Sequence, residues 1–322
     1  MRPLHVMVVV LAIVAFAFSG LSCSRQDAQE TGKIVVGFSQ IGAESDWRTA
    51  NTRSIKAEAA KRGIELRFSD AQQKQENQIK AIRSFIAQKV DVIAFSPVVE
   101  TGWEPVLREA KAAGIPVILS DRTVDVTDRS LYASFLGADF VEEGRRAAEW
   151  LAGASGGKAQ IVELQGTPGA APAIDRKKGF EEGIASHPQM KIIKSQSGDF
   201  TRAKGKEVME AFLKSPERGS ITALYAHNDD MALGAIQAIE EAGLKPGKDI
   251  LIVSIDGIRP AFQAMIDGKL NCTVECNPLL GPQLFDLVAD LKAGKQIPRR
   301  VVVKEGVFTQ ATAKTDIQTR AY

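Results

Sequence analysis

The chain has 322 residues, of which 44% are hydrophobic and 25% charged, the composition of an ordinary soluble globular protein with room for two domains. Its formal net charge is +2 and it has no long basic run, which argues against a nucleic-acid-binding protein.

The N-terminus has the pattern of an export signal. A short basic start precedes an unbroken apolar run over residues 6–18, shorter than the roughly 20 residues that a membrane-spanning helix needs. We therefore predict a signal peptide over residues 1–23 and a mature protein in the periplasm or on the outer face of the cytoplasmic membrane. Cys23 is a candidate for lipidation: Ser22 fits this interpretation and Gly20 does not. The alternative is cleavage and release.

From residue 33 onward, short β-branched runs alternate with longer stretches of helical periodicity. Ser45 is the expected N-cap of the first helix, and Gly63 ends it. In chain order we predict strand 34–38, helix 46–62, strand 64–68, helix 74–89, strand 91–95, helix 103–113, strand 116–119, helix 142–151, strand 161–164, helix 174–184, strand 192–193, helix 204–213, strand 224–226, helix 231–242, strand 251–253 and helix 261–266.

Repeated strand–helix units with short connections favour parallel sheets covered by helices on both faces. The strands outnumber those of one doubly wound domain, and polar turns near residues 124–139 separate two series of them. We therefore predict an α/β protein of two similar doubly wound parallel-sheet domains joined by a multi-strand hinge. The N-terminal domain would comprise residues 31–133 plus 277–304, and the C-terminal domain residues 134–276 plus 305–322.

Cys272 and Cys276 are four residues apart in a segment with strand character. Their Cα atoms would then be about 13 Å apart, too far for a disulfide. We predict two unpaired thiols. The three histidines of the chain lie far from them in sequence, so we expect no zinc site and no cofactor.

In open parallel sheets, ligands bind at the carboxyl ends of the strands. These ends carry acidic, amide, guanidinium and indole groups in both halves of the chain. Such groups suit a sugar, because carboxylate and amide oxygens accept from hydroxyls, N–H groups donate to them, and an aromatic face covers the C–H side of the ring. The candidate ligand-binding residues are Glu44, Ser45, Asp46, Trp47, Arg48, Asp121, Arg122, Arg176, Asn228 and Asp256.

Structural roles stay open for several of these residues and for Trp103, which could line the ligand cleft or pack in the core. Trp47 and Trp103 also suit core packing, Asp121 and Arg122 a surface pair, and Asp256 a turn. Separately, we expect Asp229 or Asp230 to cap the helix that follows and Lys177 and Lys178 to be solvated.

Motifs for catalysis are missing from the sequence. There is no phosphate-binding loop and no Gly-x-Ser-x-Gly elbow, and residues 166–169 form a short glycine turn rather than a dinucleotide fingerprint. We predict a binding protein without catalytic residues, not an enzyme.

Six stretches resemble the ribose/galactose-type periplasmic binding proteins of bacterial ABC importers, most closely the galactofuranose-binding subgroup. The likeness covers nearly the whole mature chain. The stretches are VGFSQ at 36–40, QQKQENQIKAIRSF at 72–85, TGWEPVL at 101–107, IDRKKGF at 174–180, SQSGDFTR at 195–202 and AHNDD at 226–230.

The resemblance implies a monomer that captures a monosaccharide, galactofuranose or a related furanose or pentose, between two domains and delivers it to an ABC permease with its ATPase. Trp47 would stack on the sugar, and the other candidates would bind its hydroxyls. The family's last crossover usually supplies one more polar group, here within residues 275–278. Asp46 stands where glycine is expected, and Cys23 is a second departure.

Two other functions use the same fold. A sugar sensor would report to a membrane kinase or chemoreceptor instead of a permease. LacI-type repressors carry a helix-turn-helix before the fold, where this chain has an export signal.

Overall fold

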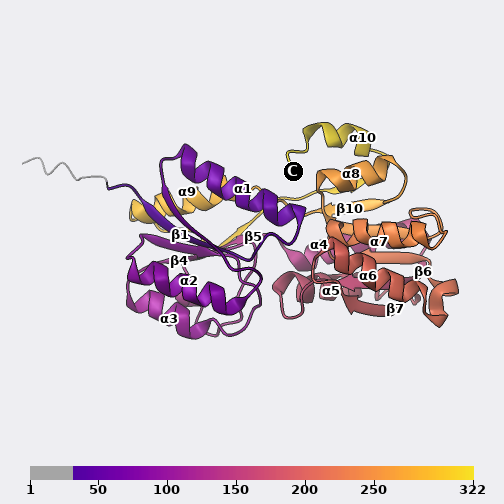
Figure 1. Ribbon diagram of the computed structural model, residues 1–322, viewed down its shortest axis with the longest axis horizontal. Helices are drawn as coiled ribbons and strands as arrows, with labels where there is room; N and C mark the ends of the chain where they lie inside the picture. Colours follow the sequence, from indigo (N-terminus) through magenta and orange to yellow (C-terminus); the bar gives the residue numbers. More distant parts are fainter. Residues whose placement is uncertain (1–31) are drawn as a thin grey trace, which may run out of the picture. The chain divides into compact units, whose positions relative to one another are not determined.

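A computed structural model describes residues 32–322, which contain two six-stranded sheets (Figure 1). The predicted signal peptide and Cys23 lie outside the described residues. Within residues 32–322, no helix combines the length and the hydropathy that crossing a membrane requires.

The first sheet has the strand order β11-β5-β4-β3-β1-β2, and all of its pairings are parallel. Its strands are β1 (Val35–Gln40), β2 (Glu65–Asp70), β3 (Val92–Phe95), β4 (Val117–Ser120), β5 (Ser134–Gly137) and β11 (Arg300–Val302). Helices α1 (Asp46–Lys61) and α9 (Gly281–Lys292) cover one face, and α2 (Gln75–Ala87) and α3 (Glu104–Ala112) cover the other (Figure 1).

Side chains of β3 show why both faces need a helical layer. Val92 and Ala94 belong to the apolar cluster beneath α1 and α9, whereas Ile93 and Phe95 belong to the one beneath α2 and α3. All four are buried, as expected for a central parallel strand. Trp103 packs in the second cluster, with its ring centroid 4.9 Å from that of Phe95, and is therefore a core residue.

The second sheet has the order β12-β10-β9-β8-β6-β7. Its strands are β6 (Lys158–Gln165), β7 (Gln189–Ser197), β8 (Ala223–Ala226), β9 (Leu251–Asp256), β10 (Cys272–Glu275) and β12 (Val307–Thr309), the last antiparallel to β10. The helices pack in pairs. These pairs are α4 (Phe140–Ser155) with α5 (Ala171–Ile184), α6 (Arg202–Leu213) with α7 (Asp229–Glu241), and α8 (Arg259–Ile266) with α10 (Ala313–Asp316).

We call each sheet with its helices a lobe. Among the described residues, three segments connect the two lobes: β5 to α4, β10 to α9, and β11 to β12. Two α/β lobes, each built on a mostly parallel sheet and joined by several segments, confirm the predicted fold class. The boundary expected after residue 133 is wrong, because β5 pairs with β4 and extends the first lobe through Gly137. This strand of four residues lies within residues 124–139, the polar stretch in which the domain boundary is predicted.

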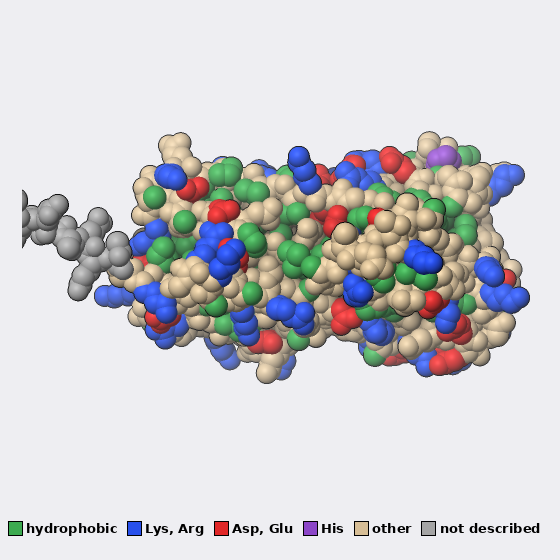
Figure 2. Space-filling view, turned by 90° about the horizontal axis from the view of Figure 1, so that it is seen from above, with side chains coloured by type: hydrophobic (Ala, Val, Ile, Leu, Met, Phe, Trp, Pro, Cys, Tyr) green, Lys and Arg blue, Asp and Glu red, His purple; other side chains and the backbone are tan. Residues whose placement is uncertain are grey.

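Cys272 and Cys276 are both buried, and both are free thiols in the described part of the chain. Cys276 follows β10 rather than belonging to it, since the strand ends at Glu275. On the surface, acidic and basic side chains are interspersed over the face seen in Figure 2 without a field of one sign.

Candidate ligand-binding site

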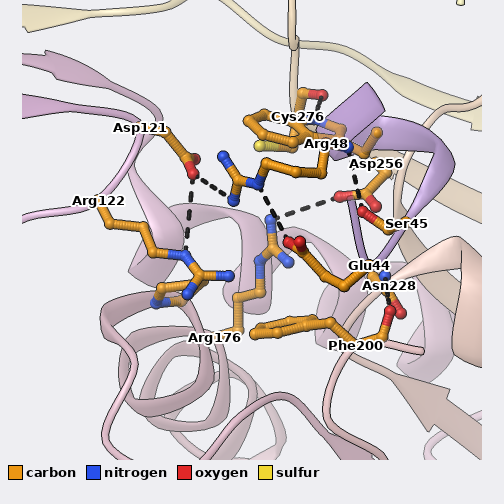
Figure 3. A pocket seen from close by; sticks show the side chains of 12 residues that line it. Glu44, Ser45, Arg48, Asp121, Arg122, Arg176, Phe200, Asn228, Asp256 and Cys276 are labelled. Carbon is orange, nitrogen blue, oxygen red and sulfur yellow. Dashed lines mark hydrogen bonds and ion pairs between the residues drawn. The ribbon is translucent and has the colours of Figure 1, made fainter. Parts of the chain in front are cut away.

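A pocket lies where the carboxyl ends of strands from both sheets meet (Figure 3). It holds about 290 Å³ of space free of protein atoms, its open side included. Nine of the ten candidate residues line it; Asp46 does not. The lining residues are Glu44, Ser45, Trp47, Arg48, Asp121, Arg122, Pro172, Arg176, Phe200, Asn228, Asp256 and Cys276.

The start of α1 supplies the first part of the pocket. Ser45 is the N-cap, as predicted, and its hydroxyl accepts from the Arg48 amide at 3.1 Å. The Arg48 guanidinium donates to Glu44 at 3.0 Å and to Asp121 at 2.7 Å. Burial lowers the pKa of Arg48, but the two carboxylates raise it by more. Arg48 is therefore a fixed cation whose position depends on two other pocket residues.

Two buried polar atoms in this part of the pocket, Glu44 Oε2 and Arg122 Nε, have no hydrogen-bond partner among residues 32–322. Arg122 donates through Nη1 to the Val98 carbonyl at 3.1 Å, and its guanidinium lies 5.1 Å from the centre of the Phe200 ring. Burial and the charge of Arg48 lower the pKa of Arg122 to about 10. Buried polar groups are normally paired, so one acceptor and one donor are available here to a polar ligand.

The second lobe contributes Arg176 from α5. Its Nε donates to Glu143 at 2.7 Å, Nη1 donates to the His227 carbonyl at 2.6 Å, and Nη2 lies 3.7 Å from Asp256. Burial raises the pKa of Asp256 well above its ordinary value, against the opposing charge of Arg176. Arg176 itself is buried. The expectation that Lys177 is solvated like Lys178 needs correction, because the Lys177 ammonium lies 3.1 Å from the carboxylate of the buried Glu163.

Asn228 lines the pocket and is also the N-cap of α7, accepting from the Met231 amide at 3.0 Å. The expected capping by Asp229 or Asp230 is therefore wrong. Asp229 instead accepts from the amides of Gly257 and Ile258, at 2.8 and 2.9 Å. It thereby fixes the turn after β9, which carries Asp256.

Three lining residues have left-handed backbone conformations, which are uncommon outside glycine. Their φ angles are 67° at Asp121, 60° at Phe200 and 130° at Asp256. Asp121 follows β4 directly, and Asp256 ends β9. Such conformations cost free energy and concentrate at functional sites, where they direct side chains that a regular strand would not.

Asp46 points to a different neighbour. Its carboxylate lies 3.1 Å from Arg202, and its amide donates to Asp230 at 2.8 Å. Its side chain is 56% exposed, which fits a contact at the edge of the lobes rather than a place in the pocket.

Sequence reasoning missed Pro172, Phe200 and Cys276 as lining residues. Phe200 lies within the stretch 195–202 that carries the family resemblance, but nothing local marked its ring for the pocket. Cys276 belongs to the final crossover, from which a polar contribution was expected. Its carbonyl accepts from the Trp47 indole N–H at 2.6 Å, and Trp47 packs in the apolar core of the second lobe.

Comparison with known proteins agrees with this architecture. A family model described as "Periplasmic binding protein domain" matches residues 36–296, and the chain belongs to this family. It is a non-enzymatic, extracytoplasmic solute-binding protein with sugar-binding relatives.

The chain is 53% identical to the galactofuranose-binding protein YtfQ of Escherichia coli K12 over 303 residues, which cover 93% of this chain and 95% of that protein. It is also similar to the crystal structure of a galactofuranose binding protein, at 55% identity and a TM-score of 0.87, covering 89% of this chain and 98% of the other. The binding protein of the arabinose ABC transporter from Shewanella sp. ANA-3, bound to α- and β-L-arabinofuranose, gives 55% identity and a TM-score of 0.87, with 89% and 95% covered.

Proposed function

We propose that this protein captures a monosaccharide in furanose form, galactofuranose or a close relative such as arabinofuranose, and delivers it to an ABC permease with its ATPase. The observation that carries the proposal is the pocket of charged, amide and aromatic side chains drawn from both lobes (Figure 3). Relatives more than 50% identical over nearly the whole chain are named for furanose ligands.

The free polar atoms suit hydroxyl groups. A sugar hydroxyl would donate to Glu44 Oε2 and accept from Arg122 Nε, the two pocket atoms that lack a hydrogen-bond partner within residues 32–322. Pairing them removes the free-energy cost of leaving buried polar groups unsatisfied. Trp47 and Phe200 would cover the C–H faces of the ring.

Binding would favour closure of the lobes about the three connecting segments. A sugar that contacts Arg122 in the first lobe and Arg176 in the second gains both sets of contacts only when the lobes are close together. The permease would then distinguish the closed form from the open one. Small-angle scattering should show a smaller radius of gyration with sugar, and equal radii would contradict closure.

Attachment to the membrane is a separate proposal. Cys23 would carry the lipid after removal of the signal peptide, and the remaining chain would work as a monomer outside the cytoplasm. Mass spectrometry of the N-terminal peptide from the membrane fraction tests this, because an unmodified N-terminus would show release instead.

Calorimetry and thermal unfolding with a panel of sugars test the ligand. We expect D-galactose and L-arabinose, which form furanoses in solution, to stabilise residues 24–322, and D-glucose and myo-inositol not to. A ligand at about 100 times its dissociation constant adds roughly 2.7 kcal/mol to the free energy of unfolding. Stabilisation by glucose alone, or by no sugar, would contradict the furanose assignment.

A further inference from the structure

A second group of polar side chains, two of them buried and one half-buried, lies behind Arg176, where the lobes are connected. It consists of Glu143 of α4, Cys276 after β10 and Glu305 between β11 and β12. One carboxylate or sulfur atom of each lies within 4.8 Å of those of the other two. Glu143 follows the first connecting segment, and Cys276 and Glu305 lie within the other two, so this group joins all three.

Close packing of α4 against α5 places Glu143 next to the sugar pocket. A Cβ atom at Gly144 would lie 2.1 Å from the Arg176 carbonyl oxygen, and one at Gly179 would lie 1.9 Å from that of Val141. Only glycine permits this approach. As a result Glu143 Oε2 accepts from Arg176 Nε at 2.7 Å.

The other oxygen of this carboxylate, Glu143 Oε1, is buried and has no partner among the described residues. The neighbouring Glu305 accepts from the Asn277 amide at 3.0 Å, and its own carbonyl accepts from Arg146 at 3.1 Å. Glu143 is buried and Glu305 half-buried, with carboxylate oxygens within 4.8 Å of each other, and this proximity disfavours ionisation of both. Because Glu143 is paired with Arg176, the proton belongs on Glu305; burial and the charge of Glu143 raise the pKa of Glu305 to about 10.

We propose that Glu305 is a positioning residue for sugar binding: its protonated carboxyl donates to Glu143 Oε1, and this hydrogen bond keeps Glu143 aligned with Arg176 in the pocket. The proposal rests on the proposed function. The same proton would add a second hydrogen bond between the segment from β11 to β12 and α4, beside the one from Arg146 to the Glu305 carbonyl, and so couple the lobe connections to the position of Arg176.

A proton fits this group better than a metal ion. Two carboxylates and a thiolate are possible ligands for a divalent cation. However, the Arg176 guanidinium already supplies a positive charge beside Glu143. Burial also raises the pKa of the Cys276 thiol well above its ordinary value, so this thiol is protonated when no cation is bound.

Other titratable or charged groups surround the pair and bear on its pH dependence. In the second lobe these groups are Arg176 of α5, Asp256 of β9, Tyr225 of β8, and Arg146 and Asp139 at the start of α4. In the first lobe the group is Arg300 of β11. Burial raises the pKa of both Tyr225 and Asp256. Asp256 therefore titrates above its usual range, so the experiment must compare variants at Glu305 rather than use the wild-type profile alone.

The test measures the affinity of the mature chain for L-arabinose and D-galactose from about pH 7 to about pH 10.5. Relative to Glu305→Gln, the affinity of the wild type should fall by about a further twofold at a pH equal to the pKa of Glu305 and more steeply above it, since half of the molecules then lack the proton. Arg122, whose pKa is also about 10, titrates in both proteins and cancels in this comparison. Glu305→Gln, whose amide also donates, should lose this additional pH dependence. Glu305→Ala should bind more weakly than Glu305→Gln at every pH, by about fivefold or more.

Glu182→Gln is the matched control, because Glu182 pairs with Arg145 at the surface of α5 and should follow the wild-type profile. Circular dichroism establishes that each variant is folded at each pH. Identical pH profiles for the wild type and Glu305→Gln would overturn the proposal. So would stabilisation of the wild type by Zn²⁺ that Glu305→Gln abolishes, since a cation would then occupy the group.

Infrared spectroscopy separates this proposal from the assignment of the ligand. The protonated carboxyl of Glu305 should give a C=O band at neutral pH that Glu305→Gln removes, with or without sugar. Absence of that band overturns the shared proton irrespective of sugar binding. The band without any sugar binding would support the shared proton and count against the proposed function.

Discussion

The carboxylate of Asp46 accepts a hydrogen bond from Arg202 at 3.1 Å and so links α1 of the first lobe to α6 of the second. Arg202 also lies 2.8 Å from Asp230. The family resemblance leads us to expect glycine at position 46, which has no side chain for such a contact. We therefore expect Asp46 to act on the contact between the lobes.

We predict that Asp46→Ala weakens sugar affinity about two- to fivefold, because an exposed ion pair contributes at most about 1 kcal/mol. The loss should shrink at high salt, which screens exposed charges. Isothermal titration calorimetry at low and high salt measures both effects. The control is Glu104→Ala, which removes a similar exposed pair with Arg108 at the start of α3. A larger, salt-independent loss would place Asp46 in the ligand site instead.

Arg122 is predicted to matter for binding and not for folding. Its buried Nε has no hydrogen-bond partner among residues 32–322 and lies 3.8 Å from Asp121 Oδ2. Burial lowers the pKa of Arg122 to about 10, which means that the fold holds this cation at a free-energy cost. Arg122→Met should therefore weaken sugar binding at least tenfold, about 1.4 kcal/mol, without lowering the free energy of unfolding.

Calorimetry and urea unfolding test the two halves of this prediction, with Arg83→Met as a surface control. Arg83 pairs with Glu109 where both side chains are about half exposed. Loss of stability together with retained affinity in Arg122→Met would show that Arg122 is a structural cation.

Much of the site could be predicted because parallel sheets bring the carboxyl ends of their strands to one edge. Polar residues after apolar runs, such as Asp121 after β4 and Asp256 at the end of β9, were therefore expected to meet. Nine of ten candidates line one pocket for this reason. Their roles in binding stay predictions until a ligand is measured.

What the sequence did not predict depends on small local differences or on long-range packing. β5 has only four residues and carries no long apolar run. Residues 228–230 are all of types that cap helices well. The sequence does not show which of them is the N-cap of α7, which in the structure is Asn228, two residues after the end of β8. The approach of Glu305 to Glu143 depends on how the connecting segments pack, which periodicity does not report.

The strained backbone conformation of Asp256 leads to a prediction that two variants of this residue test against each other. Its φ of 130° suits glycine and is unfavourable for other residues. Asp256→Gly should raise the free energy of unfolding by about 1–3 kcal/mol relative to Asp256→Ala, because only glycine relieves the strain. Both variants lack the carboxyl and should lose sugar affinity to the same degree. Equal stabilities would contradict strain at this position, and wild-type affinity in both variants would contradict a role for the carboxyl.

Asp229 should make stability depend on pH. Burial raises its pKa to about 6, despite hydrogen bonds from Ser254, Thr273 and the Ile258 amide. The folded state then binds more protons than the unfolded state between about pH 4 and about pH 6, so stability falls as the pH rises through this range and is constant above it.

The expected fall is roughly 3 kcal/mol, since one pKa unit corresponds to about 1.4 kcal/mol. Urea unfolding of the wild type and Asp229→Asn at a series of pH values measures the contribution of Asp229 together with its effect on Asp256, because groups that do not interact with Asp229 cancel in the difference. A difference that stays constant between about pH 4 and about pH 7 would show that Asp229 keeps an ordinary pKa.

Substitution of Gly166 would displace the ring of Phe200, an aromatic residue that lines the pocket, without replacing a lining residue. A Cβ atom at this position would lie 1.9 Å from the Phe200 ring, far inside van der Waals contact, so Gly166→Ala requires the ring to shift. If Phe200 covers a face of the sugar, Gly166→Ala and Phe200→Ala should each weaken binding about fivefold or more, since aromatic contacts typically contribute about 1 kcal/mol.

The double variant distinguishes this mechanism from two independent effects. Once Phe200 is alanine, a methyl group at position 166 no longer displaces a ring, so the two losses in binding free energy should not add. Calorimetry of the four proteins in the cycle measures the coupling. Additive losses would mean that Gly166 acts through its backbone, whose amide lies 3.4 Å from His227 Nδ1, and not through the ring.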